Sequence, residues 1–144
     1  MCNCRSKDKC PLNGRCLERS VIYQATVETD NSAETYVGLT ENEFKTRFNS
    51  HNASFNNTNR RNTTELSKHV WTLKDQGMPY KISWKIIEKA NAYSNNTKRC
   101  MLCICEKYHI IYNHQQATLN KRTEILNTCR HSRKYLLTHP NSIT

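Results

Sequence analysis

Two short runs of β-branched and aromatic residues constrain the fold more than any other feature of this sequence. They cover residues 21–28 and 34–39, and a polar stretch at 30–32 separates them. Polar breaks of this length commonly join neighbouring strands, so the pattern predicts two antiparallel strands. A third run at 82–87 places three apolar side chains on one face of a strand. The sequence therefore predicts a small three-stranded antiparallel sheet.

Apolar residues at helical spacing lie between and after these runs. The first helix is expected to open at Thr40 or Glu41, and Thr64 is the expected N-cap of the second. The expected helices cover about residues 40–55, 64–77, 98–112 and 121–128. The predicted fold class is therefore α+β, a three-stranded antiparallel sheet flanked by helices with cysteine-rich appendages that bind zinc.

The length and charge of the chain narrow its organisation and its partners. At 144 residues it fits one domain, expected at 18–138, with a cysteine-rich segment at 1–17 and a tail at 139–144. A net charge of +10 favours a polyanion such as DNA as the partner, although a basic surface without a partner has the same charge. No run is long enough for a membrane span, so a nuclear or cytoplasmic protein is expected. Candidate DNA contacts, or simply solvated side chains, are Lys45, Arg60, Arg61, Arg130, Arg133 and Lys134.

The chain has eight cysteines, seven of which fall in two sets with metal-ligand spacing. In a reducing compartment such clusters indicate metal, whereas in a secreted chain they would indicate disulfides. The first expected Zn²⁺ site consists of Cys2, Cys4, Cys10 and Cys16, in a segment with too few apolar residues to fold on a core of its own. The second consists of Cys100, Cys103, Cys129 and His131, with His109 or His114 as alternatives to His131. Cys105 is either a core thiol or an alternative ligand.

Four side chains near the first predicted hairpin suit phosphodiester chemistry. Tyr23 and Tyr36 lie on adjacent predicted strands, and Arg47 and His51 follow at i,i+4 spacing on the first helix. A guanidinium can fork onto two phosphate oxygens, and phenol and imidazole groups can move protons. The alternatives are two half-buried strand tyrosines, an exposed helix arginine and a solvated histidine.

Glu106 lies on the third predicted helix and shares a face with Leu102, Cys103 and Ile110. A carboxylate on an apolar face requires a cation. That cation is either a metal or a basic neighbour such as Lys107. Asn120, after this helix, either helps to hold the site or caps the next segment.

The segments Val21-Ile22-Tyr23 and Tyr36-Val37-Gly38, with Arg47 and Glu106 on later helices, resemble the GIY-YIG nuclease superfamily. The resemblance covers about residues 21–120 and implies the superfamily's fold. It also implies an endonuclease in which Tyr23 is the general base or positions water, Tyr36 binds the phosphate or a metal-bound water, and Glu106 holds Mg²⁺ or Mn²⁺. Many relatives have a basic residue after the second glycine, where this chain has Leu39 and Thr40.

The cysteine blocks narrow this resemblance to the endonuclease domain of Penelope-like retroelements. The blocks concerned are CNCR…CPLNGRC, CxxCxxEK at 100–107 and LNKRTE…CRH at 119–131. In that family the domain follows a reverse transcriptase and nicks target DNA, so a reverse transcriptase domain is a possible partner. The alternative is a zinc-stapled DNA-binding module without catalytic activity, from a decayed element.

Overall fold

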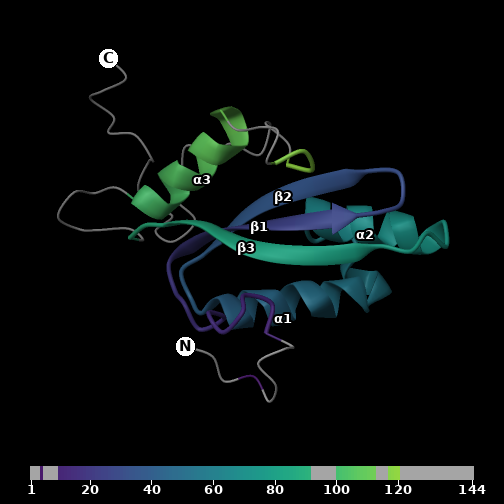
Figure 1. Cartoon of the computed structure of the whole chain (residues 1–144), viewed down its shortest axis with the longest axis horizontal. Coiled ribbons are helices and arrows are strands. Elements are labelled where there is room, and N and C mark those ends of the chain that lie inside the picture. The colour runs from purple at the N-terminus through teal and green to yellow at the C-terminus, as the bar shows by residue number, and fades with distance from the viewer. Residues whose placement is uncertain (1–3, 5–9, 92–99, 113–116, 121–144) are drawn as a thin grey trace.

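The computed structural model describes residues 4, 10–91, 100–112 and 117–120 (Figure 1). Its elements are β1 (Val21–Glu28), β2 (Ala33–Thr40), α1 (Phe44–Phe55), a 3-10 turn η2 (Thr58–Arg60), α2 (Glu65–Asp75), β3 (Lys81–Lys89) and α3 (Met101–Tyr112). The α+β class and the small antiparallel sheet of the prediction are confirmed. The predicted helix at 121–128 lies outside the described residues. No helix among the described residues is both long enough and apolar enough to cross a membrane.

The three strands form one antiparallel sheet in the order β2-β1-β3. Thr29 closes the β1–β2 turn by donating its backbone N–H to the carbonyl of Ser32 (2.8 Å). The register opposes Tyr23 to Gly38 and Ala25 to Tyr36, so both tyrosines lie on the same face of the sheet. A register shift occurs between β1 and β3 next to Tyr23. β1 is the central strand, which places Tyr23 in the middle of the sheet.

The sheet separates two apolar cores, as the alternation of its side chains requires. One core lies between the sheet and the helices α1 and α2, and it contains Tyr23, Phe44 and Val70. The other lies under α3 and contains Ile22 and Val37. Figure 1 shows α3 on one face of the sheet and α1 on the other. The molecule is therefore a three-layer arrangement in which the sheet lies in the middle.

The beginnings of the first two helices differ in how well the sequence predicts them. Thr64 caps α2 as expected, because its hydroxyl accepts the backbone N–H of Ser67 (3.0 Å). The first helix starts at Phe44 instead of Thr40 or Glu41, since β2 continues to Thr40. The first-turn amides of α1 at Phe44 and Lys45 donate to the carbonyls of Glu18 (2.9 Å) and Cys16 (2.7 Å). The end of the cysteine-rich segment and the residue after it thus cap α1, which no local sequence signal indicates.

Part of the N-terminal segment also belongs to the main core. Cys10, Leu12 and Cys16 are buried and pack in the same cluster as Tyr23 and Phe44. The shortage of apolar residues in this segment predicts that it has no core of its own and that metal holds it. The structure shows that it also shares the core of the main domain.

Candidate active site

A buried polar cluster joins β1 to α1 on the face of the sheet that α1 covers. The hydroxyl oxygen of Tyr23 lies 2.8 Å from His51 Nε2 and 3.2 Å from Arg47 Nε, which donates to it. Tyr23 is fully buried, His51 is 2% exposed and Arg47 is partly exposed. The i,i+4 spacing on α1 brings the cation and the imidazole to the same phenol. Arg47 is therefore the member of this trio that solvent can reach.

Gly38 makes room for Tyr23. A Cβ atom at position 38 would lie 2.5 Å from Cζ of the tyrosine ring and closer still to its hydroxyl oxygen. The ring thus lies across the neighbouring strand at a position that has no side chain. The tyrosine and the glycine are partners in the β1–β2 register. The glycine is required here for space, because its backbone does not adopt a left-handed conformation.

The charges of the cluster follow from its burial. Desolvation, together with the nearby charge of Arg47, lowers the pKa of His51 from 6.5 to about 3. His51 is therefore neutral at physiological pH. Burial lowers the pKa of Arg47, but the hydroxyls of Tyr23 and Tyr36 beside it raise that pKa by more, so the net shift is upward. Arg47 therefore remains a cation, and the Tyr23 oxygen that accepts from it can donate its own proton to His51 in the tautomer that leaves Nε2 unprotonated.

Tyr36 completes the cluster from the edge strand β2. Its ring is 8% exposed and packs edge-on to the His51 ring, with the ring centroids 5.9 Å apart. Its hydroxyl is one of the two that act on Arg47. The structure thus brings together Tyr23, Tyr36, Arg47 and His51.

Glu106 does not join this group. It lies on α3, which packs on the opposite face of the sheet from α1 (Figure 1). Its side chain is buried, and its Oε1 accepts from Lys107 Nζ at 2.9 Å. The carboxylate on the apolar face thus has a cation, and that cation is the neighbouring lysine. This pairing gives a Mg²⁺ site at Glu106 no support, because the carboxylate already has its cation.

Asn120 binds the backbone of β2. Its Oδ1 accepts the N–H of Val37 at 2.7 Å, and its Nδ2 donates to the carbonyl of the same residue at 2.8 Å. Two residues earlier, Thr118 Oγ1 accepts the N–H of Thr35 at 2.8 Å. The segment at 117–120 therefore pairs with the outer edge of β2, next to Tyr36. The Asn120 side chain thus holds the backbone of β2, one of the strands that carry the site. No described interaction joins it to the tyrosine cluster.

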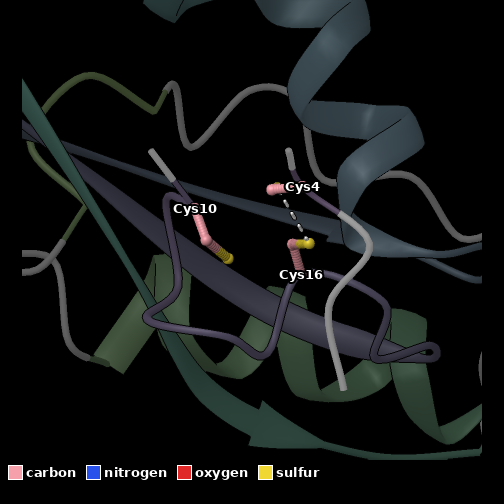
Figure 2. A group of neighbouring side chains, drawn as sticks. All are labelled: Cys4, Cys10 and Cys16. Atoms are coloured by element: carbon pink, nitrogen blue, oxygen red, sulfur yellow. Dashed lines mark hydrogen bonds between the residues drawn. The ribbon is translucent and has the colours of Figure 1, made fainter. Parts of the chain in front are cut away.

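Three thiols of the N-terminal segment meet beside α1. The Sγ atoms of Cys4, Cys10 and Cys16 all lie within 4.8 Å of one another, as Figure 2 shows. Cys4 and Cys16 Sγ are 3.7 Å apart, well beyond a disulfide bond length of about 2 Å. The backbone N–H of Gly14 donates to Cys10 Sγ (3.1 Å), and an amide donor of this kind stabilises a thiolate. These residues are placed to hold a metal ion, while Cys2, the predicted fourth ligand, lies outside the described residues.

The second predicted zinc site is described only in part. Cys100, directly before α3, and Cys103, on α3, are both buried, and Cys129 and His131 lie outside the described residues. Burial raises the pKa of the Cys105 thiol, and the adjacent Glu88 carboxylate raises it further. Cys105 is partly buried and packs against the core that contains Leu102 and Ile110.

The basic residues expected to contact DNA have different surroundings. Arg61 pairs with Asp75 and lies over the Trp71 ring, 5.4 Å from its centroid. Arg60 reaches Ser50 Oγ at 3.5 Å, at the limit of a hydrogen bond. Lys45 is half-buried on the first turn of α1. The remaining candidates, Arg130, Arg133 and Lys134, lie outside the described residues.

Trp84 belongs to the site, although the sequence assigns it no role there. Its ring centroid lies 6.0 Å from that of Tyr23 and 5.5 Å from that of His51. The alternation of the third strand predicts its inward face, but it does not indicate which side chains the ring meets.

Comparison of the chain with protein-family models, with curated proteins and with solved structures found no match.

Proposed function

We propose that this protein is a DNA endonuclease that nicks one strand by phosphodiester hydrolysis at the Tyr23 cluster. The observation that carries the proposal is the Tyr23 hydroxyl held between His51 Nε2 (2.8 Å) and Arg47 Nε (3.2 Å). A phenol between a neutral base and a fixed cation can pass on a proton at neutral pH, which an isolated phenol with a pKa near ~10 does poorly. The resemblance to GIY-YIG nucleases supports the same residues.

The proposed reaction has a balanced proton path. Water attacks phosphorus and gives its proton to the Tyr23 oxygen, while the Tyr23 proton moves to His51 Nε2. The new P–O bond forms as the bond to the 3′ oxygen breaks, and the products have a 5′-phosphate and a 3′-hydroxyl once solvent protonates the leaving oxygen. The remaining N–H groups of the Arg47 guanidinium stabilise the negative charge that develops on the phosphoryl oxygens.

Phosphate binding would also make His51 a stronger base. The charge of Arg47 is the second cause, after burial, of its low pKa. A phosphate on the guanidinium offsets that charge, so the pKa of His51 rises when substrate is present. Substrate binding thus offsets the smaller of the two causes of the low pKa and leaves burial, the larger one, in place.

Metals enter this proposal in two ways. We propose Zn²⁺ as the structural ion of Cys4, Cys10 and Cys16, because three thiolates in a small cluster are the ligands that Zn²⁺ favours. A second Zn²⁺ at Cys100 and Cys103 needs the ligands Cys129 and His131. The resemblance implies Mg²⁺ or Mn²⁺ at Glu106, but the pairing of this carboxylate with Lys107 gives that role no support.

A second candidate function rests on the burial of Tyr23. A phenol with no exposed surface holds α1 to the sheet even when no substrate reaches it. In that case the protein is a zinc-stapled module that binds DNA without cutting it. Both candidates place it in the nucleus or cytoplasm, where a reverse transcriptase domain of the parent retroelement is a possible partner.

A plasmid-nicking assay separates the two candidates. Wild type is compared with Tyr23→Phe and Arg47→Ala, each with Mg²⁺, with Mn²⁺ and with chelator added after zinc loading. The nuclease proposal expects both variants to nick about 100-fold more slowly, since each loses a group that acts in the transition state. Lys68→Ala is the matched control, because it removes one positive charge from a partly exposed ion pair on α2.

Equal nicking by wild type and both variants would refute the proposed site. Absence of nicking by wild-type protein that still shifts the plasmid in a gel would favour the binding module. Nicking that requires a divalent ion and is lost in Glu106→Gln, while the variant keeps wild-type stability, would restore the metal role of Glu106.

A further inference from the structure

Two neighbouring cavities lie between the N-terminal segment and the edge strand β3. The first, of about 200 Å³, is lined by Leu12, Asn13, Arg15, Trp84, Lys85 and Ile86. The second, of about 410 Å³, is lined by Leu17, Glu18, Arg19, Ser20, Lys89 and Asn91. The first cavity lies between residues 12–15 and 84–86, and the second lies between residues 17–20 and 89–91, further along the same two segments. We call this surface the β3 groove.

The β3 groove is strongly basic. It contains Arg15, Arg19, Lys85 and Lys89, all of them exposed, and Glu18 is its one carboxylate among the lining residues. Glu18 pairs with Arg15 at 2.8 Å. Among the described residues, no carboxylate forms an ion pair with the other three cations. Unneutralised cations along a groove attract a polyanion.

The two lysines of the groove lie along the outer edge of the sheet. Lys85 is opposite Gln24 and Lys89 is opposite Val21, so the register shift beside Tyr23 places their side chains on opposite faces of β3. β3 is an edge strand, and flexible lysine side chains from both faces can reach an anion that follows this edge. A phosphate backbone lying along the groove would therefore meet an ammonium group on either side of β3.

Trp84 connects the groove to the candidate active site. One part of its surface lines the first cavity, beside Arg15 and Lys85. Its ring also packs against Tyr23 and His51, with centroids 6.0 and 5.5 Å away. A backbone in the groove would therefore contact the ring that packs against the Tyr23 cluster.

We propose that the β3 groove binds the phosphate backbone of the nucleic acid on one side of the Tyr23 cluster, through Lys85, Lys89 and Arg19. The inference rests on the proposed function for the identity of the polyanion and assigns where that polyanion lies. The 60–61 loop is a weaker candidate for this contact. Its Arg61 already forms an ion pair with Asp75 and a cation–π contact with Trp71.

The test is fluorescence anisotropy with a labelled DNA duplex over a range of salt concentrations, with chelator added to zinc-loaded protein to prevent cleavage. Lys85→Ala/Lys89→Ala should weaken binding about 10-fold and lower the slope of log K against log salt by about two. Both side chains are exposed, so the variant should fold, and circular dichroism checks this. Arg60→Ala/Arg61→Ala removes the same charge from the loop and should weaken binding less.

Unchanged affinity and slope in the lysine variant would overturn the proposal, and so would a larger loss in the arginine variant. Lysine-dependent binding of equal strength to anionic lipid vesicles would replace nucleic acid with a membrane surface and would also overturn it. Binding is measured without cleavage, so the two proposals can fail separately. If the wild-type protein does not nick and the lysine variant loses binding, the proposed chemistry alone is rejected. Nicking that survives with unchanged binding in the lysine variant would reject the groove alone.

Discussion

Gly38→Ala tests the closest approach in the site, between the second strand of the hairpin and the Tyr23 ring. The new Cβ would lie 2.5 Å from Cζ and 2.9 Å from Cε2, and it would be closest to the hydroxyl oxygen. The ring cannot move away easily, because it is fully buried and packs against Phe44, His51 and Trp84. Overpacking of a tight core costs about 1–3 kcal/mol. A displaced hydroxyl would lose about 1 kcal/mol more through its hydrogen bond to His51.

We therefore expect Gly38→Ala to lower the free energy of unfolding by about 3 kcal/mol, measured by urea denaturation. The same change should abolish nicking, because it moves the phenol away from His51 and Arg47. In a Tyr23→Leu background the ring atoms that clash are gone. There the alanine should cost less than about 1 kcal/mol, since it also reduces the entropy of the unfolded chain.

The comparison between the two backgrounds is a double-mutant cycle with an expected coupling of about 2 kcal/mol or more. Tyr23→Phe provides the control, because it removes the hydroxyl but keeps Cζ and Cε2, so Gly38→Ala should remain costly in that background. Equal costs of Gly38→Ala in the wild-type and Tyr23→Leu backgrounds would refute the claim that the glycine exists to accommodate the ring.

Three further predictions concern other parts of the structure. Unfolded His51 binds a proton below about pH 6.5 while folded His51 stays neutral to about pH 3, so unfolding takes up a proton in this window and stability falls as pH falls. Urea titrations at several pH values should show this slope, and His51→Gln should flatten it. Zinc removal by chelator, or Cys10→Ser, should lower the melting temperature by several degrees. The reason is that the segment that caps α1 and joins the core loses the proposed Zn²⁺ ion. A melting curve insensitive to zinc would contradict this. Asn120→Ala should lower the free energy of unfolding by about 2 kcal/mol, since it leaves the N–H and carbonyl of Val37 without these two bonds, whereas Asn120→Asp should retain part of the stability through its Oδ1.

The sequence is most informative where local patterns decide the structure. Alternation of side chains predicts all three strands, and the hydroxyl of Thr64 predicts the start of α2. The grouping of Tyr23, Arg47 and His51 also follows from local rules, because strand register and helical spacing together place them on one face. Contacts between distant segments cannot be predicted in this way. Examples are the carbonyls of Cys16 and Glu18 that cap α1 and the clamp of Asn120 on β2.

Glu106 shows why burial and chemistry on one helix do not fix a functional role. The sequence correctly requires a cation for this buried carboxylate, and both a metal and Lys107 meet that requirement. Periodicity says which face of α3 is apolar, but it does not say which face of the sheet the helix covers. The structure places α3 across the sheet from α1, so the carboxylate and the Tyr23 cluster lie on opposite faces of the sheet.

A test of Glu106 must therefore measure folding beside activity. Removing one partner of a buried ion pair destabilises a protein by about 3–5 kcal/mol. Loss of nicking in Glu106→Ala alone would follow from that instability as readily as from a lost metal. The Glu106→Gln/Lys107→Met pair removes both charges at similar volume, so retention of nicking in this double variant would establish that the ion pair is structural.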